Sequence, residues 1–135
     1  MTSSKPFSLG KNERLKSRKQ IDILFGEGKK INIFPYRLLY RREAGGNALK
    51  AGFTVSSKIF PRAVDRNRIK RLTREAYRVQ KNELEELVLK NKEQIHLFFI
   101  YTGKEMTSLQ ETSACIKIIL GKLIQNLNAI YSANT

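Results

Sequence analysis

Apolar residues along the first half of this chain predict an early helix followed by three strands. Residues 17–25 begin with a capping-box pattern, and apolar residues follow it at helical spacing, so a short helix is expected there. Residues 29–33 favour a short strand, and residues 36–42 and 49–56 favour two more. The segment Gly45-Gly46-Asn47 tolerates positive φ, which predicts a hairpin between the last two strands.

The second half of the chain alternates helical and apolar segments. Residues 63–89 have a helical pattern, whereas residues 95–101 (IHLFFIY) form a continuous apolar run that is typical of a strand covered on both faces. A second capping-box pattern at residues 108–111 opens a last helix. The predicted order is therefore αβββαβα, in which a small sheet packs against helices.

Length and composition indicate one domain. The 135 residues, 41% of them hydrophobic, suffice for a single core, and we expect a flexible basic arm over residues 1–13 and one domain over residues 14–135. Cys115 is the single cysteine and His96 the single histidine, so neither a disulfide nor a four-ligand zinc site can form within the chain. The start of the chain lacks the apolar core of a signal peptide, and no apolar run is long enough for a membrane span. A cytoplasmic location and no membrane partner are therefore expected.

The net charge of the chain indicates what kind of partner it binds. Twenty-six Lys and Arg against twelve Asp and Glu give a formal charge of +14, which favours a polyanionic partner. Residues 58–81 alone carry nine basic and two acidic residues, whereas residues 105–135 are neutral overall. Half of the net charge thus lies in one short segment, which indicates a binding face and not an even charged coat.

The helix predicted from residue 63 gathers these cations on one side. At about 100° per residue, its basic side chains fall within an arc of about 140°, and its apolar side chains fall on the other side. Like charges along one stripe destabilise a helix unless a polyanion binds them, and arginines suit bidentate contact with phosphate. The basic stripe comprises Arg66, Lys70, Arg71, Arg74, Arg78 and Lys81, and the expected core stripe comprises Ile69, Leu72, Ala76 and Val79.

The same helix resembles the signature of the bacterial ribonuclease P protein subunit. Residues 63–77 read AVDRNRIKRLTREAY, which contains the R-N-R and I-K-R elements of that family and a further Arg. Residues 52–58 (GFTVSSK) resemble the strand end V-S-x-K of the family, residues 14–25 its first helix, and residues 95–101 its late buried strand. The resemblance covers about residues 11–130.

This resemblance implies a fold, a function and partners. The fold is α+β, a single-domain two-layer sandwich of order αβββαβα with a left-handed βαβ crossover, which is rare elsewhere. The family protein binds a large catalytic RNA, and the complex removes the 5′ leader of precursor tRNA by Mg2+-dependent hydrolysis. The chain would be a subunit of an endoribonuclease whose chemistry belongs to the RNA, with Mg2+ held mainly by the RNA and the substrate.

The resemblance also assigns roles to two groups of residues. Ile21 stands where the family commonly has Phe, so it cannot stack on a base as an aromatic ring can, and Ser57 stands where a second Lys is frequent. The residues that match the RNA-binding motif are Arg66, Asn67, Arg68, Lys70, Arg71 and Arg74, with Arg78 on the same stripe; those that match the cleft for the single-stranded leader are Ile21, Phe25, Arg37, Leu39 and Lys58.

The residues themselves provide no protein catalyst. The chain has no Ser-His-Asp set, no Cys-His pair and no gathered carboxylates. His96 and Cys115 lie in apolar segments and are expected in the core. Asp65 and Glu75 are too far apart to hold two metal ions, and Asp65 is expected to cap the basic helix. No catalytic residue and no protein-bound metal are therefore predicted.

Other function classes are compatible with parts of this pattern. A general RNA- or ribosome-binding protein with no processing role would carry the same basic helix. A DNA-binding module is disfavoured, because the basic helix lacks the short turn and partner helix of a helix-turn-helix. A protein-only nuclease would need carboxylates gathered at one site. None of these patterns fixes the RNA subtype or the oligomeric state of the protein.

Overall fold

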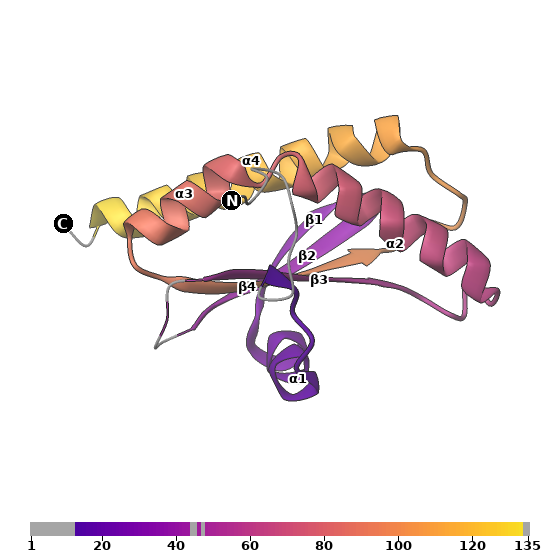
Figure 1. Cartoon of the computed structure of the whole chain (residues 1–135), viewed down its shortest axis with the longest axis horizontal. Helices are drawn as coiled ribbons and strands as arrows, with labels where there is room; N and C mark the ends of the chain where they lie inside the picture. Colours follow the sequence, from indigo (N-terminus) through magenta and orange to yellow (C-terminus); the bar gives the residue numbers. More distant parts are fainter. Residues whose placement is uncertain (1–12, 44–45, 47, 134–135) are drawn as a thin grey trace, which may run out of the picture.

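The residues described by the computed structural model, 13–43, 46 and 48–133, form four helices and one four-stranded sheet (Figure 1). The elements in chain order are α1 (Arg18–Glu27), β1 (Lys29–Ile33), β2 (Tyr36–Glu43), β3 (Leu49–Val55), α2 (Ala63–Arg78), α3 (Asn82–Lys90), β4 (Gln94–Tyr101) and α4 (Leu109–Ala133). Each predicted strand and helix is present, and the helix predicted over residues 63–89 is divided into α2 and α3.

The strand order in the sheet is β1-β2-β4-β3. β4 pairs antiparallel with β2 and parallel with β3, so it separates the two strands that the sequence joins as a hairpin. The hairpin prediction is therefore wrong; Gly46 lies in the connection, whereas Gly45 and Asn47 lie outside the described residues. The physical reason is burial, because the apolar strand β4 is covered on both faces only in a central position.

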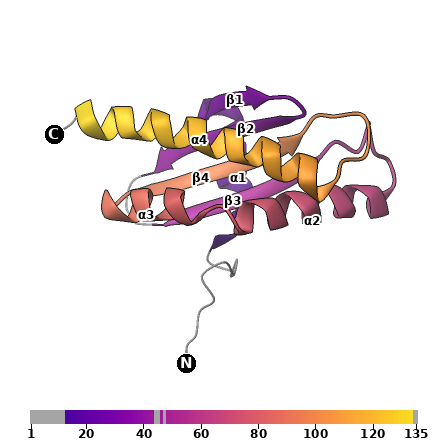
Figure 2. The same cartoon turned by 90° about the horizontal axis from the view of Figure 1, so that it is seen from above.

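β3, α2, α3 and β4 form a βαβ unit with two neighbouring parallel strands. Seen from the helical side in Figure 2, the two helices return above the sheet and β4 lies on the side of β3 that faces β2. This path is left-handed, as the resemblance implies and against the usual hand. The connection places α2 above the sheet near β3, with its outer face away from the core.

Helices cover both faces of the sheet. α2, α3 and α4 lie on one face, and α1 lies on the other (Figure 1). The first face and its helices enclose the larger core, and this part is the expected two-layer sandwich. Beneath α1 lies a smaller core, formed by Leu15, Leu24, Leu39 and Phe98.

α1 begins as the sequence predicts and ends before Gly28. The Ser17 hydroxyl accepts a hydrogen bond from the backbone N–H of Gln20 at 3.3 Å, which satisfies one donor of the first turn. The Gly28 N–H donates to the Leu24 carbonyl at the other end. Leu24 itself is 1% exposed and holds the helix to the sheet through the smaller core.

The single helix predicted over residues 63–89 is broken between Arg78 and Asn82. Lys81, at this break, is 2% exposed, and its ammonium lies 2.6 Å from Glu13 and 3.4 Å from Glu85. A buried cation requires such partners, because burial of an unpaired charge costs several kcal/mol. Lys81 therefore does not belong to the outward basic stripe, and Glu13 contacts the folded domain. Residues 1–12 lie outside the described residues.

The buried side of α2 differs from the predicted core stripe. Ile69 and Ala76 are buried as predicted, but Leu72 is only half-buried and Val79 is 42% exposed. Thr73 and Tyr77 take the buried positions instead. The Tyr36 hydroxyl hydrogen-bonds the Thr73 hydroxyl at 2.6 Å, so this polar side chain is satisfied inside the core.

The predicted N-cap of α2 is also displaced. Arg62 occupies the N-cap position without a side-chain hydrogen bond, and Asp65 lies inside the first turn. Asp65 therefore does not cap the helix; its carboxylate lies near the positive end of the helix dipole, where a negative charge is favourable.

Replacing Ile69 by Ala is expected to lower the free energy of unfolding by about 2–5 kcal/mol, because this side chain is completely buried. Leu72→Ala is expected to cost less, since Leu72 is half-buried. Urea unfolding of both variants measures the difference. An equal or larger loss for Leu72→Ala would mean that α2 faces the sheet with a different side.

Candidate nucleic-acid interface

The outer face of α2 carries most of the cations that the sequence singles out. Asn67, Arg68 and Arg71 are exposed, and Lys70 and Arg74 are partly exposed towards β3. The structure thus brings the central part of the predicted motif together on one surface. This outer α2 face is defined here as Asn67, Arg68, Lys70, Arg71 and Arg74.

Two further predicted arginines have partners within the protein. The Arg66 guanidinium donates to the carbonyls of Phe60 and Pro61, both at 2.8 Å, and so ties the connection before α2 to its first turn. Arg78 forms an ion pair with Glu75 at 2.7 Å, and this hydrogen bond lowers the pKa of the Glu75 carboxyl. Glu75, the one acidic residue in the stripe, thus offsets the charge at the C-terminal end of α2.

A cavity of about 210 Å³ separates the outer α2 face from the chain before α1. Phe53 lies among its lining residues, and the Arg74 guanidinium lies 5.8 Å from the centre of the Phe53 ring. Four of the lining side chains are cations and none is acidic. This cationic hollow is lined by Arg14, Lys16, Lys70 and Arg74 together with Leu15, Ala51, Gly52 and Phe53.

Arg14 and Lys16 are site residues that the sequence analysis missed. The N–H of Leu15 donates to the Ala51 carbonyl at 2.9 Å, and Arg14 forms a β-bridge with Ala51, so this segment follows the outer edge of β3. Leu15 is buried and the two cations beside it are exposed. The alternation Arg-Leu-Lys is the signal for an extended segment, but it is too short to stand out in the sequence.

The face of the sheet that carries α1 is only partly covered. Beyond α1, one cross-strand row runs through all four strands, from β1 to β2, β4 and β3. Arg37 is exposed in this row, and its Nε donates to Asn32 Oδ1 at 2.9 Å. The row contains no acidic residue. This open sheet face is defined as Asn32, Arg37, Ile100 and Thr54.

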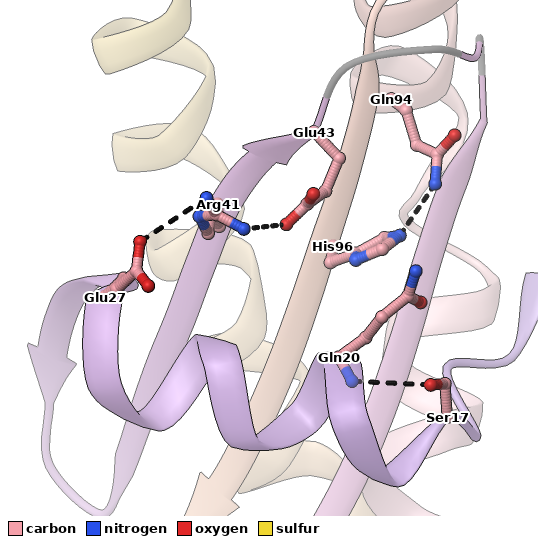
Figure 3. Close-up of polar contacts among 7 residues, drawn as sticks. All are labelled: Ser17, Gln20, Glu27, Arg41, Glu43, Gln94 and His96. Atoms are coloured by element: carbon pink, nitrogen blue, oxygen red, sulfur yellow. Dashed lines mark hydrogen bonds and ion pairs between the residues drawn. The ribbon is translucent and has the colours of Figure 1, made fainter.

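One flank of α1 borders the open sheet face. Glu27 approaches Arg41 at 3.4 Å on the other flank (Figure 3). At about 100° per residue, Ile21 lies about 120° and Phe25 about 160° around the helix from Glu27, so both face away from that flank. Phe25 is 53% exposed and makes an edge contact with Phe98, with ring centroids 5.5 Å apart. Phe25 thus combines a supported ring with an accessible face.

Leu39 and Lys58, also predicted for the leader cleft, lie outside the exposed row of the open sheet face. Leu39 is 1% exposed beneath α1, so it supports the smaller core and offers no surface to a ligand. The sequence alternation correctly predicts that Leu39 shares a face of β2 with Arg37 and Arg41. α1, however, covers the sheet at Leu39. Lys58 is exposed in the turn beyond β3, where its N–H donates to Ser56 Oγ at 3.2 Å.

His96 lies fully buried under α1, next to Gln94 (Figure 3). Its Nε2 shares a hydrogen bond with the Gln94 amide nitrogen at 2.8 Å, whereas its Nδ1 has no partner within the described structure. Burial lowers the pKa of His96, the nearby cations Lys50 and Arg41 lower it further, and the carboxylate of Glu43 alone opposes them by raising it. His96 is therefore a neutral core residue, as predicted, and not an accessible base.

Other chemical groups give no catalytic arrangement among the described residues. No three His, Cys, Asp or Glu side chains there lie close enough together to hold a metal ion. Cys115 is buried, as predicted, and burial raises the pKa of its thiol. No helix of the described part of the chain is long and apolar enough to cross a membrane.

Known proteins share both the sequence and the fold of this chain. The family model described as ribonuclease P matches residues 9–123. The chain belongs to the ribonuclease P protein family. It is 35% identical over 129 residues to the ribonuclease P protein component of Porphyromonas gingivalis, covering 94% of each chain, and 34% identical over 130 residues to that of Chlorobaculum tepidum, covering 88% of this chain and 84% of the relative.

Solved structures of the family share the fold. The RNase P protein of Staphylococcus aureus matches with a TM-score of 0.66 at 18% identity, over 84% of this chain and 96% of that one. The protein from Thermotoga maritima matches with a TM-score of 0.64 at 23% identity, over 82% of this chain and 96% of that one. At these identities the likeness supports the architecture, which agrees with the predicted fold class.

Family membership confirms the predicted function. The chain is a protein component of ribonuclease P, an endoribonuclease that acts as a ribonucleoprotein in tRNA 5′ processing, and ribonuclease P RNA is its partner. The alternative of a general RNA- or ribosome-binding protein does not fit these relatives.

We expect the stability of the protein to fall as the pH drops below about 6.5, the pKa of an unperturbed histidine. Burial lowers the pKa of His96 in the folded state, so the unfolded chain binds a proton first and is favoured by acid. The loss begins near pH 6.5 and grows until the pH reaches the folded-state pKa. Urea unfolding between pH 7.5 and 5.5 measures it.

His96→Gln provides the control for this pH dependence, because the chain contains no other histidine. The variant is expected to show a flatter profile over the same range, whatever its stability at pH 7.5. A profile as steep as that of the wild-type protein would show that His96 is not the group that titrates.

Proposed function

We propose that this chain holds two RNA strands on two separate surfaces: ribonuclease P RNA on the outer α2 face and the cationic hollow, and the 5′ leader of precursor tRNA on the open sheet face beside α1. The observation that carries the proposal is the distribution of charge and aromatic surface. Cations gather on the outer α2 face and around the cationic hollow, whose lining contains no acidic residue, whereas an exposed aromatic ring and one arginine border the other surface.

The outer α2 face suits a folded RNA. Arg68 and Arg71 are exposed, and their guanidinium groups suit phosphate oxygens. The cationic hollow extends this surface to the edge of β3, since Arg14 and Lys16 face Lys70 and Arg74 there. Contacts of this kind depend on the charge of the RNA phosphate backbone and not on the identity of the bases, which suits an RNA recognised by its shape.

The open sheet face suits a single strand. Phe25 presents an accessible ring for stacking, Ile21 lies beside it, and Arg37 supplies a cation. Aromatic rings that stack on bases and cations that neutralise phosphates bind single-stranded RNA with little dependence on sequence. We assign the leader to this surface, with Lys58 at its far end and with Leu39 as a support beneath α1.

The proposed place of Mg2+ follows from the donor atoms that the protein offers. Mg2+ prefers carboxylate and phosphate oxygens, and the described carboxylates do not gather at one point. The side chains present thus do not fit a dedicated site, so we assign Mg2+ to the RNA and the substrate. The protein contributes by binding and orienting the strands.

Replacing Arg68 and Arg71 by Ala is expected to weaken binding of ribonuclease P RNA several-fold or more. Both side chains are exposed, so the melting temperature should change little. The dependence of log affinity on log salt, expected with a slope on the order of −4 to −6 for the wild-type protein, should become shallower by about 1–2. Filter binding over a salt series measures both quantities.

The matched control is Lys90→Ala with Lys117→Ala, which removes the same charge from exposed positions on α3 and α4. This variant should bind the RNA nearly as well as the wild-type protein. Equal losses for the two double variants would mean that net charge, and not the outer α2 face, determines affinity.

Phe25→Ala is expected to weaken the affinity of the reconstituted holoenzyme for precursor tRNA with a long leader by about 1–3 kcal/mol, because one base loses its stacking partner. Affinity for a substrate without a leader and for the catalytic RNA should stay nearly unchanged. Binding assays with the two substrates, together with the melting temperature, separate this role from packing.

A purely structural role of Phe25 predicts a different pattern. Its ring packs on Phe98, so loss of that contact would lower the melting temperature and harm all binding together. Phe25→Leu, which keeps apolar volume without an aromatic face, should retain stability but not the preference for a long leader. Equal losses on both substrates would reject the leader assignment and leave that of the outer α2 face intact.

A further inference from the structure

Phe34, at the turn between β1 and β2, is the most exposed large hydrophobic side chain of the described residues. It is 81% exposed, more than Phe25 at 53% or Val64 at 68%. It belongs to neither hydrophobic core. An aromatic ring held this far into solvent contributes little to folding and leaves its face accessible to a ligand.

A cavity of about 520 Å³ lies beside this ring, at the end of the sheet. It opens between the β1–β2 turn and the loop from β4 to α4, which lie at the same end of the molecule (Figure 2). The cavity, here called the Phe34 hollow, is lined by Phe34, Pro35, Tyr101, Thr102, Gly103, Lys104, Glu105, Met106, Thr107 and Glu111.

Hydrogen bonds hold the two sides of the Phe34 hollow in a fixed arrangement. The backbone N–H of Thr102 donates to the Pro35 carbonyl at 2.7 Å, and its hydroxyl donates to the same oxygen at 3.0 Å. The Tyr101 hydroxyl donates to the Glu105 carbonyl at 2.6 Å. The hollow is therefore formed in the protein alone, and a ligand would not have to order these loops.

The lining favours a nucleobase over a phosphate group. Phe34, Pro35 and Met106 supply apolar surface suited to the flat face of a base. Lys104 is the one cation of the lining, whereas Glu105 and Glu111 are carboxylates, so the local charge disfavours an anion. Carboxylate oxygens can accept hydrogen bonds from the amino groups of bases, and an exposed aromatic ring can stack on any base.

The Phe34 hollow adjoins the open sheet face at the β1–β2 turn and extends around the end of the sheet to its helical side, since Tyr101 and Glu111 also line it. Asn32 and Arg37 are cross-strand partners in the last row of that face, and the β1–β2 turn with Phe34 connects their two strands. A strand that passes Phe25 and Arg37 therefore meets the turn at the end of the sheet. The occupant that this placement favours is the same single strand, extended by one or more nucleotides.

We propose that Phe34 and the Phe34 hollow form a second stacking site, which receives an unpaired base of the precursor tRNA leader where the strand leaves the open sheet face. This inference rests on the proposed function, since it requires the leader to lie on that face. It makes affinity depend on leader length in two steps, one at Phe25 and one at Phe34.

The test compares Phe34→Ala with the wild-type protein in the reconstituted holoenzyme, on precursor tRNAs whose leaders are lengthened one nucleotide at a time. The variant is expected to lose about 5- to 100-fold in affinity once the leader reaches a threshold length, and to match the wild-type protein below it. The fluorescence of a 2-aminopurine base at the threshold position should be quenched by the wild-type holoenzyme and not by the variant. Phe34→Trp should restore both signals.

Ile118→Ala is the matched control, because Ile118 is also an exposed apolar residue, 51% exposed on α4 and not part of the lining. It should leave every affinity unchanged. Since Phe34 has little buried surface, Phe34→Ala should keep the wild-type melting temperature, which excludes misfolding as a cause.

Other results would overturn the proposal. No change at any leader length, an equal loss at all lengths, weaker binding of the catalytic RNA, or a change confined to self-association would each assign Phe34 another role or none. If Phe25→Ala shows leader dependence and Phe34→Ala does not, this inference alone fails. If neither variant does, the assignment of the leader to the open sheet face fails as well.

Discussion

Burial of β4 on both faces is the constraint on which the rest of the structure depends. Leu97 and Phe99 enter the larger core under α2 and α4, and Phe98 enters the smaller core under α1. A strand that is apolar on both sides requires a helical layer on each face and neighbours on each edge. The fold meets this requirement by placing β4 between β2 and β3, with α2 and α4 on one face of the sheet and α1 on the other. The outer α2 face and the open sheet face therefore lie on different sides of the sheet.

Local sequence signals predicted the helices and strands well, but they did not predict which strands pair with each other. The capping box at Ser17 and the apolar spacing of α1 depend on neighbours within one turn, so they could be recognised directly. The alternation in β2 identified its two faces correctly, because strand geometry alone determines them. It carried no information on which strand lies beside β2, and the glycine-rich connection therefore suggested a hairpin that β4 prevents.

The candidate site was predictable to a similar degree. The exposed cations of α2 follow from its periodicity, whereas the burial of Lys81 depends on a helix break and on Glu13, far away in the sequence. The role of Arg66 in holding Phe60 and Pro61 requires the path of a loop. Arg14 and Lys16 join the site only because their segment follows the edge of β3. A helical projection of one segment shows which of its side chains share a face, but not their contacts with residues that are distant in the sequence.

The two surfaces lie on opposite sides of one sheet, and this arrangement suits the proposed role of the protein in positioning two RNA segments. Side chains of β4 pack against helices on both sides, so the outer α2 face and the open sheet face are parts of one rigid body. A rigid connection fixes the distance and orientation between two bound strands, and such positioning lowers a barrier by paying the entropy of alignment in advance. The left-handed connection through α2 contributes directly, because it places the basic helix beside the edge of β3 and leaves the opposite face of the sheet to α1.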